Sequence, residues 1–359
     1  MNRRNSKGVS PLAESPLQLS NPRMILVTGG CGYVGSVLVP YLAHKYPVRV
    51  YDSFAFGNPL PTDLGIECIE GDIRNQAGLA LALKGVTHVI HLAGIVTDEL
   101  VDINPLLSQE INVDASHNLC ILASKAGEAE RFIYASSSSV YGSSPIDCTE
   151  ESMCYPETAY ARQKFEAERL LLREFRERLE VVALRSATCC GPSPRMRLDT
   201  IINVFSKQAM YDEQITVHGG DQVRSNVHVQ DIARAYEALL LAPASVVDGH
   251  VFNATCTNAT ALDLAVLVQE AYLDIYGIIR PVVIDSTKRD TRHYRMNASK
   301  IRDAVGWAPV YSIRQAVEAN WAYFLQGGID PNAALHYNTR RMRQSMLTGM
   351  APTALTTTN

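Results

Sequence analysis

Residues 24–35 read MILVTGGCGYVG and run directly into the helix-like stretch SVLVPYL. The four apolar residues suit a buried parallel strand, and Gly30, Gly32 and Gly35 provide the G-x-G-x-x-G spacing that turns such a strand into a helix. In this arrangement Gly30 allows the tight turn, Gly32 lets the backbone approach a pyrophosphate, and Gly35 lets the helix pack on the strand. Free N–H groups at the helix start would bind the phosphates. The stretch therefore predicts a dinucleotide-binding α/β domain.

A second apolar run, VRVYD at 48–52, ends in an acidic residue 17 positions after Gly35. An acid at this place accepts hydrogen bonds from the ribose hydroxyls of adenosine and repels a 2′-phosphate. Asp52 therefore predicts NAD as the cofactor, in preference to NADP.

Short apolar runs alternate with helical patterns along the chain, as in a parallel sheet that is covered by helices on both faces. After the first two runs come 66–69, 86–93, 131–136 and 181–185. Between residues 105 and 126 apolar side chains recur every three or four positions, and Gly127 then ends the predicted helix. Six or seven parallel strands with interleaved helices predict an α/β fold with a doubly wound, Rossmann-type sheet.

From about residue 186 the pattern changes to longer loops and isolated elements, with helices expected at 261–276 and 312–325 and a strand at 281–285. This region should form a smaller C-terminal α/β domain that caps the carboxyl edge of the sheet. The expected organisation is a disordered tail at 1–22, a Rossmann domain at 23–185, a mainly substrate-binding domain at 186–330, with some segments returning to the sheet, and a C-terminal tail at 331–359.

Composition limits the possible functions. The 359 residues are 47% hydrophobic and 19% charged, which is ordinary for a globular protein with a large core, and the length suggests two domains. The net charge is −4 and the folded region has no Lys/Arg run, so neither nucleic acid nor an anionic membrane is expected as a partner. No 18-residue apolar run or signal-peptide core occurs. Eight cysteines without a C-x-x-C pair suggest reduced thiols in the cytoplasm, and the nine histidines show no metal-ligand spacing.

A row of hydroxyl groups follows the fifth apolar run, in the sequence ASSSSVYG at 135–142. Tyr160 and Lys164 then open the next helix, and a spacing of four places both on one helical face. A phenol with a pKa of about 10 is a poor base at neutral pH, but a neighbouring ammonium and a nicotinamide cation both favour its phenolate form. Tyr160 would then take a proton from a substrate hydroxyl as hydride leaves its carbon, while a serine hydroxyl holds that oxygen.

In their order, these motifs resemble those of the extended short-chain dehydrogenase/reductases, in the group of NAD-dependent sugar-nucleotide epimerases, dehydratases and reductases. The similarity covers about 24–324 and includes TGGCGYVG, GDIR at 71–74, HLAG at 91–94, INVD at 111–114, SSSSVYG, YARQK, CGP and VRSNVHVQD at 223–231. It implies that Ser137, Tyr160 and Lys164 are catalytic. It also implies cofactor contacts from Gly29, Gly30, Gly32, Tyr33, Val34, Gly35, Asp52, Asp72, Ile73, Leu92, Ala93, Gly94 and Asn112, together with Tyr160 and Lys164.

The same resemblance implies a nucleotide-diphosphate sugar as the substrate and a homodimer, in which helices near 105–126 and 157–178 pair into a four-helix bundle. Substrate contacts are expected from Ser138, Ser139, Thr188, Arg224 and Arg289. Arg224 matches the arginine that the family places on the diphosphate, whereas Thr188 stands where the family often has an asparagine. Further candidates for phosphate or sugar contacts are Arg195, Arg197 and Arg292.

Three kinds of function remain open at the level of sequence. Hydride transfer at C4, by a 4-epimerase or a 4-dehydrogenase/reductase, is favoured over a 4,6- or 5,6-dehydratase and over a catalytically silent dinucleotide-binding protein. Silent relatives usually lack the tyrosine or the lysine, and this chain has both. Dehydratases of the family commonly carry an Asp-Glu pair where this chain has Ser138 and Ser139, and serine is neither a useful acid nor a useful base. A displaced carboxylate, Asp98 or Glu99, could still support elimination.

Overall fold

Seven parallel strands form the central sheet of the protein, whose computed structural model describes residues 23–175, 178–287, 293–327 and 329–348. Their order in the sheet is β11-β7-β5-β4-β1-β2-β3. The strands are β1 (Ile25–Thr28), β2 (Val48–Asp52), β3 (Glu67–Glu70), β4 (His88–His91), β5 (Arg131–Ser137), β7 (Glu180–Ser186) and β11 (Val251–Ala254). Ile25 of β1 lies in register with Val48 on one side and His88 on the other. The apolar runs of the sequence are continuous because the central strands are buried on both faces.

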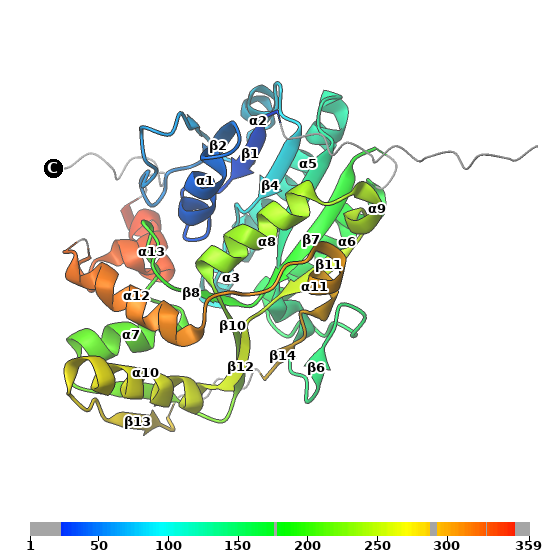
Figure 1. Ribbon diagram of the computed structural model, residues 1–359. Coiled ribbons are helices and arrows are strands. Elements are labelled where there is room, and N and C mark those ends of the chain that lie inside the picture. Colours follow the sequence, from blue (N-terminus) through cyan, green and yellow to red (C-terminus); the bar gives the residue numbers. More distant parts are fainter. Residues whose placement is uncertain (1–22, 176–177, 288–292, 328, 349–359) are drawn as a thin grey trace, which may run out of the picture.

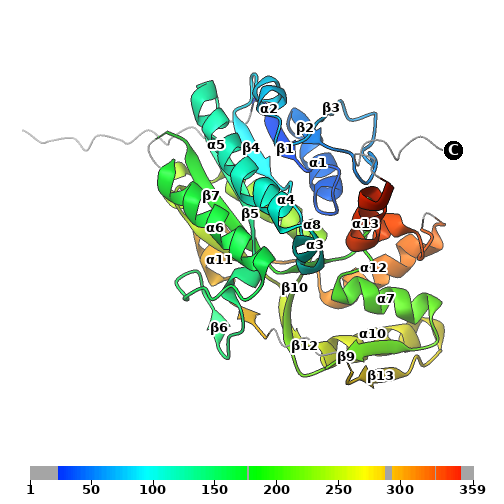
Figure 2. The same ribbon diagram turned by 180° about the vertical axis from the view of Figure 1, so that it is seen from behind.

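Helices cover both faces of this sheet, as a doubly wound fold requires (Figures 1 and 2). On one face lie α1 (Gly35–Ala43) and α8 (Val229–Leu241), which pack with Ile133 of β5. On the opposite face lie α2 (Gln76–Ala82), α5 (Ala115–Ala126) and α6 (Ala159–Glu174), which pack with Phe132 of the same strand. The alternation of Phe132 and Ile133 between the two cores follows from the two-residue period of a strand. The predicted Rossmann-type sheet is confirmed.

The predicted helix at 105–126 is interrupted in the structure. It consists of α4 (Pro105–Gln109), a π-helical turn η1 (Glu110–Asp114) and α5, and it ends as expected at Gly127, whose φ is 74°. A π turn adds one residue to the helical repeat and commonly marks a functional position. Here it carries Asn112, which lies fully buried beside the sheet.

Most of the elements that follow residue 186 gather at one end of the sheet, together with the short strand β6 (Figure 1). They include the three-stranded sheet β12-β10-β8 and the pairs β13-β9 and β14-β6. Their bounds are β6 (Asp147–Cys148), β8 (Thr188–Cys190), β9 (Ile215–His218), β10 (Val223–His228), β12 (Thr257–Thr260), β13 (Val282–Asp285) and β14 (Arg295–Met296). Among them pack α7 (Ile201–Tyr211), α10 (Ala261–Tyr276) and α12 (Ile313–Leu325), around the buried Trp321. The proposed domain boundaries stay a prediction, although β11 and α8 do return to the main sheet.

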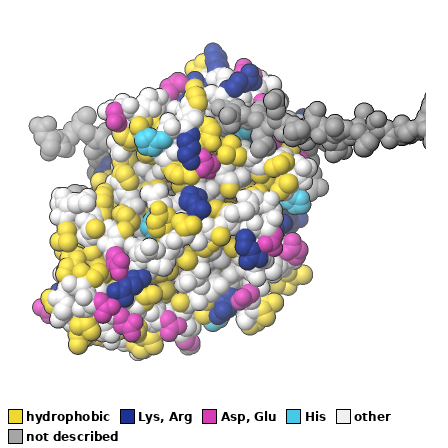
Figure 3. Space-filling model, in the orientation of Figure 1, with side chains coloured by type: hydrophobic (Ala, Val, Ile, Leu, Met, Phe, Trp, Pro, Cys, Tyr) yellow, Lys and Arg dark blue, Asp and Glu magenta, His cyan; other side chains and the backbone are white. Residues whose placement is uncertain are grey.

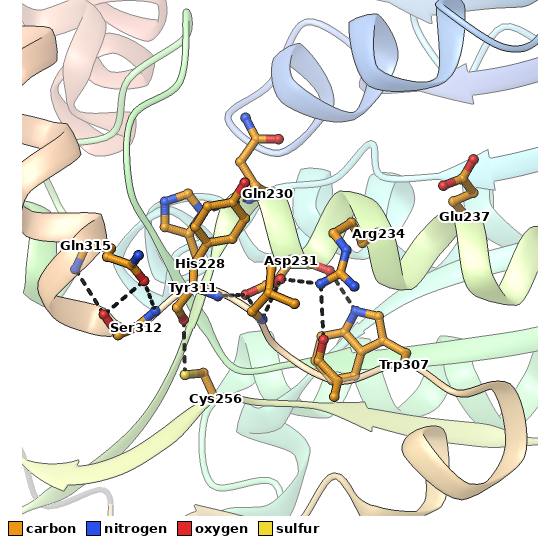
Figure 4. Close-up of polar contacts among 12 residues, drawn as sticks. His228, Gln230, Asp231, Arg234, Glu237, Cys256, Trp307, Tyr311, Ser312 and Gln315 are labelled. Atoms are coloured by element: carbon orange, nitrogen blue, oxygen red, sulfur yellow. Dashed lines mark hydrogen bonds and ion pairs between the residues drawn. The ribbon is translucent and has the colours of Figure 1, made fainter.

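Asp231, at the start of α8, fixes the loop that leads into α12 (Figure 4). Its buried carboxylate accepts hydrogen bonds from the backbone N–H groups of Val310 (3.1 Å) and Tyr311 (3.0 Å), and it pairs with Arg234 at 2.7 Å. The His228 ring stacks on Tyr311 with 4.6 Å between the ring centroids. His228 also accepts the backbone N–H of Gln230 at 3.0 Å, so it joins the start of α8 to this loop.

The C-terminal segment differs from the expected tail. It forms a 3₁₀ turn η3 (Ala334–His336) and the helix α13 (Asn338–Thr348), which lies beside α3 (Asp98–Ile103) in both views (Figures 1 and 2). The sequence of α13, NTRRMRQSMLT, has no apolar stripe, and this is why hydrophobic periodicity missed it. Shorter elements complete the fold: η2 (Ser138–Tyr141), α9 (Ala244–Val247) and α11 (Ser299–Val305).

Acidic and basic side chains are interspersed over the face shown in Figure 3. Within the described ranges, no helix combines the length and the apolar character needed to cross a lipid bilayer.

Candidate active site

A cavity of about 1500 Å³ lies at the carboxyl ends of the central strands. The loops after β1, β2, β4 and β5 form one side of it, and residues of the second region form the other. Ligands of open parallel sheets bind at this edge because the connections leave a crevice there. The cavity is therefore the candidate active site.

The glycine-rich turn forms a cradle in which a Cβ atom has almost no room. Gly29, rather than Gly30, takes the left-handed conformation, with a φ of 72°, and a Cβ there would lie 2.6 Å from the Ala93 nitrogen. A Cβ on Gly30 would lie 2.8 Å from the Val50 side chain, and one on Gly35 would lie 2.5 Å from the Gly29 carbonyl oxygen. The role expected for Gly30 in the tight turn thus belongs to Gly29, since the left-handed region strongly favours glycine. The cradle fits the close approach of a dinucleotide pyrophosphate.

Asp52 ends β2 and lines the same cavity. Its carboxylate accepts the backbone N–H of Cys31 at 2.9 Å and that of Phe54 at 2.8 Å. Burial raises the pKa of this carboxyl, and the hydrogen bonds from Cys31 and Phe54 oppose the rise. The turn and the acid predicted to recognise adenosine ribose are therefore joined directly by a hydrogen bond.

The other predicted cofactor residues divide into two groups. Lining the cavity are Gly29, Gly32, Tyr33, Val34, Gly35, Asp52, Asp72, Ile73, Leu92, Ala93 and Gly94. Gly30 and Asn112 are not part of this lining. Asn112 lies behind it, where its Oδ1 accepts the N–H of Ile95 at 2.8 Å and its Nδ2 donates to the Ile95 carbonyl at 3.0 Å. Asn112 thus holds the wall of the cavity, and its direct contact with a cofactor stays a prediction.

Ser137, Tyr160 and Lys164 come together at the carboxyl end of β5 and all line the cavity. Burial raises the pKa of the Tyr160 phenol to about 12, and a hydrogen bond from Ser137 and the charge of Arg197 oppose this rise. The Ser137 hydroxyl also accepts hydrogen bonds from the backbone N–H of Ser139 (3.2 Å) and from its hydroxyl, which lies 2.9 Å away. The serine row therefore organises the oxygen-binding side of the site.

Lys164 is one helical turn beyond Tyr160 and only 3% exposed. Its ammonium donates to the Ala135 carbonyl at 2.9 Å and lies 4.9 Å from the centroid of the Tyr134 ring. Burial lowers the pKa of Lys164 to about 8. The expected lowering of the Tyr160 pKa by Lys164 is not seen in the free protein, because burial dominates and the net shift is upward.

A buried ion pair anchors the helix that carries these two residues, and the sequence analysis did not find it. Glu168, one turn after Lys164, pairs with Arg185 of β7 at 2.5 Å and accepts the Ser136 hydroxyl at 2.6 Å. Arg185 also donates to the Tyr141 hydroxyl at 3.0 Å. In the sequence, Glu168 follows Lys164 by four residues and so lies on the same helical face, which indicates a buried carboxylate. Only the fold shows that Arg185 lies opposite.

The predicted substrate residues Ser138, Ser139, Thr188 and Arg224 all line the cavity. The buried guanidinium of Arg224 donates to the Val223 carbonyl at 2.9 Å and lies 5.6 Å from the centroid of the Tyr294 ring. The further candidates Arg195 and Arg197 also line the cavity, whereas Arg289 and Arg292 lie outside the described residues. In the described part of the chain, no three His, Cys, Asp or Glu side chains gather as metal ligands would.

Residues 25–255 match the NAD dependent epimerase/dehydratase family. Among curated relatives, the chain is 29% identical over 326 residues to UDP-glucuronic acid decarboxylase 6 of Arabidopsis thaliana, covering 86% of this chain and 90% of the relative.

Two solved structures show the same fold with ligands in place. MoeE5 in complex with UDP-glucuronic acid and NAD has a TM-score of 0.72 and 28% identity, with 84% of this chain and 99% of that chain covered. The UDP-glucuronic acid 4-epimerase of Bacillus cereus, in complex with UDP-glucuronic acid and NAD, has a TM-score of 0.73 and 25% identity, with coverage of 84% and 99%.

Proposed function

The chain belongs to the NAD dependent epimerase/dehydratase family, and from this premise we propose that it transfers hydride at C4 of a nucleotide-diphosphate sugar, as a 4-epimerase or a 4-dehydrogenase/reductase. It is an NAD-dependent enzyme of the extended short-chain dehydrogenase/reductase type that acts on sugar nucleotides. The observation that carries the finer proposal is the gathering of Ser137, Tyr160 and Lys164 on the wall that also holds the glycine cradle.

The residues of the cradle fit NAD. Gly32 leaves the pyrophosphate side of the turn without a side chain, and no side chain caps the start of α1, so its first N–H groups can bind the phosphates. Asp52, held by two backbone N–H groups, presents a carboxylate for ribose hydroxyls. When bound, NAD accepts a hydride from the sugar carbon and can return it.

The side chains of the chain move the proton and hold the substrate. Tyr160 takes the proton from the C4 hydroxyl through its phenolic oxygen, and Ser137 holds the same substrate oxygen by a hydrogen bond. The positive charge of Arg197 favours the phenolate form of Tyr160, and Lys164 adds a second positive charge one helical turn beyond Tyr160. Arg224, Ser138, Ser139 and Thr188, which line the same cavity, bind the nucleotide-diphosphate sugar.

The residues at 138 and 139 favour hydride transfer over elimination. A 4,6-dehydration needs a base for the C5 proton and an acid for the departing C6 hydroxyl, and two serines supply neither at neutral pH. Both Asp98 and Glu99 line the cavity, but Glu99 is paired with Arg343 at 2.6 Å, whereas the charge of Asp98 acts on Tyr160. Asp98 is thus the carboxylate that a dehydratase would have to use as its acid or its base.

A second candidate function is decarboxylation of a nucleotide-linked uronic acid, favoured by the similarity to the Arabidopsis decarboxylase. Oxidation at C4 places a ketone β to the C6 carboxylate. The C5–C6 bond can then break to release CO₂, its electrons form an enolate, and a proton is added at C5 before hydride returns to C4. No hydroxyl leaves in this reaction, so it does not need an acidic residue at the positions of Ser138 and Ser139.

The test is to incubate the protein with NAD and either UDP-glucose or UDP-glucuronic acid in deuterated water, and to examine the products by NMR. The proposal expects inversion at C4, or a 4-keto sugar, without deuterium at C5. A new C6 methyl with deuterium at C5 would show dehydration and overturn the proposal. A pentose with CO₂ release would establish the second candidate instead. The matched control is Tyr160→Phe, which keeps the ring and should give none of these products.

A further inference from the structure

The C-terminal segment contributes to the wall of the active-site cavity. Asn338, Thr339 and Met342 are among the residues that line it. This segment follows α12 and lies far in sequence from every other part of the site. Specific contacts hold this segment at the cavity, and these contacts indicate what it does there.

Residues 336–338 run beside the loop 195–199 and are joined to it at three points. The Leu198 N–H donates to the His336 carbonyl at 2.8 Å, and the backbone N–H of Asn338 donates to the Asp199 carboxylate at 3.1 Å. The Arg195 guanidinium donates to the Asn338 side-chain oxygen. Asn338 is buried, so water does not compete strongly for these bonds. One residue of the C-terminal segment therefore holds both ends of the loop.

The first arginine of this loop faces the cofactor side of the cavity. The Arg195 backbone N–H donates to the Ser36 hydroxyl, in the first turn of α1, at 3.2 Å. Its guanidinium lies 3.8 Å from the centroid of the Phe56 ring, in the loop after β2, and its charge interacts with Asp52. The side chain is 4% exposed, and among the described residues its Nε has no hydrogen-bond partner. A buried guanidinium with an unused donor that lines a cavity suits an anionic ligand.

The second arginine faces the reacting end. Arg197 pairs with Asp199 at 2.8 Å, and its charge acts on the Tyr160 phenol. Because Asp199 also accepts the Asn338 N–H, the position of the Arg197–Asp199 pair depends on Asn338. Asn338 thus contacts both Arg195, on the cofactor side of the cavity, and the Asp199 partner of Arg197, at the reacting end.

The rest of α13 fastens this support to the Rossmann side. Arg341 Nε donates to the Ala55 carbonyl at 3.0 Å, whereas the pair of Arg343 with Glu99 at 2.6 Å is half exposed and contributes little. Met342 packs against the buried Leu100 and Val101 of α3. The helix therefore bridges the loops after β2 and β4 and the loop 195–199.

We propose that Asn338 is a positioning residue of the active site, which aims Arg195 at a phosphate of the dinucleotide and, through Asp199, aims Arg197 at the sugar nucleotide. The proposal rests on the proposed function for the identity of the two ligands, NAD and a sugar nucleotide, both of which contain phosphate groups. A planar guanidinium group binds phosphate through two parallel N–H donors, so the strength of this contact depends on how the group is oriented. Burial, followed by the charge of Arg197, lowers the pKa of Arg195 to about 9, and a bound phosphate would relieve this cost.

The test compares three variants by calorimetric NAD binding and by the KM for the sugar nucleotide. Asn338→Ala removes the side-chain oxygen that accepts from Arg195 but keeps the backbone N–H that holds Asp199. It should therefore weaken NAD binding by about tenfold, the effect of losing one hydrogen bond to a charged group, and should leave the KM for the sugar nucleotide nearly unchanged. Asn338→Asp keeps an acceptor oxygen for Arg195 and should recover most of the affinity. Arg343→Ala breaks a half-exposed contact of the same helix and should bind NAD as the unmodified protein does.

Several results would overturn this role. If Asn338→Ala binds NAD normally and changes only the melting temperature, Asn338 is merely structural. The same conclusion follows if Arg343→Ala weakens binding as much as Asn338→Ala. Should Asn338→Ala fail to fold, hydrogen exchange of the unmodified protein decides: NAD should slow exchange at 195–199 and 338–343, and unchanged exchange there rejects the role. Absence of NAD binding by the unmodified protein would instead reject the proposed function.

Discussion

Replacing Lys164 by Met should stabilise the fold while removing a catalytic charge. Burial lowers the pKa of Lys164 from its ordinary 10.5 to about 8, a difference of about 2.5 units. At 1.36 kcal/mol per unit, keeping this ammonium charged in the folded protein costs about 3 kcal/mol. Methionine has a similar volume, but it leaves the Ala135 carbonyl without its donor, which costs about 1 kcal/mol. The variant should therefore be more stable by about 2 kcal/mol at pH 7.

The sign of the pH dependence follows from proton binding. Between pH 8 and 10.5 the unfolded lysine still holds its proton and the folded one does not, so the unmodified protein gains stability as pH rises. Below pH 8 the lysine is charged in both the folded and the unfolded protein, so the full cost of burying its charge is present. The advantage of Lys164→Met should thus be largest at pH 7 and should approach zero near pH 9.5.

Guanidinium denaturation of both proteins, freed of nucleotide and followed by circular dichroism, measures this difference at pH 7 and 9.5. Other groups that titrate in this window are common to both proteins, so the difference isolates Lys164. A Lys164→Met protein that is less stable at pH 7 would refute the reasoning. So would a stability difference that does not change between the two pH values.

Three further predictions concern the anchor, the cofactor and the assembly. Glu168→Gln leaves the buried Arg185 charge uncompensated and should destabilise the protein by roughly 3 kcal/mol or more in the same denaturation assay; a loss below about 1 kcal/mol would show that the pair is dispensable. Asp52→Ala should narrow the preference for NAD over NADP measured by calorimetry, and tighter NADP binding by the unmodified protein would contradict the role of Asp52. Light scattering at micromolar concentration should give the mass of a homodimer formed through the helices near 105–126 and 157–178, and a monomeric mass would count against it.

The sequence predicted the features that depend on local pattern. The apolar runs and the glycine spacing located six of the seven strands of the central sheet but not β11, and the bounds of α10 were predicted to the residue. Gly29 and Gly30 were confused because the spacing of glycines does not say which one takes a positive φ. The π turn at Asn112 was missed because one extra residue hardly disturbs a spacing of three and four.

Features that depend on contacts between distant segments could not be predicted. The pair of Glu168 and Arg185 requires knowing that α6 crosses β7 at these residues. The helix α13 is polar on most sides, and side-chain hydrogen bonds such as that of Arg341 to Ala55 hold it in place. No single-sequence pattern indicates that such a segment reaches the cavity, so it was expected to be a tail.

The proposed function requires that hydride leave the sugar at C4 without exchange with water, either to return to C4 or to remain on the cofactor. The most direct measurement uses UDP-glucose and UDP-glucuronic acid deuterated at C4, with NAD, and locates the label after turnover by NMR and mass spectrometry. The label should return to C4 of the product or remain in the reduced cofactor, and the labelled substrate should react more slowly than the unlabelled one. Loss of the C4 label to water would contradict the claim, because it would mean that C4 gives up a proton and not a hydride.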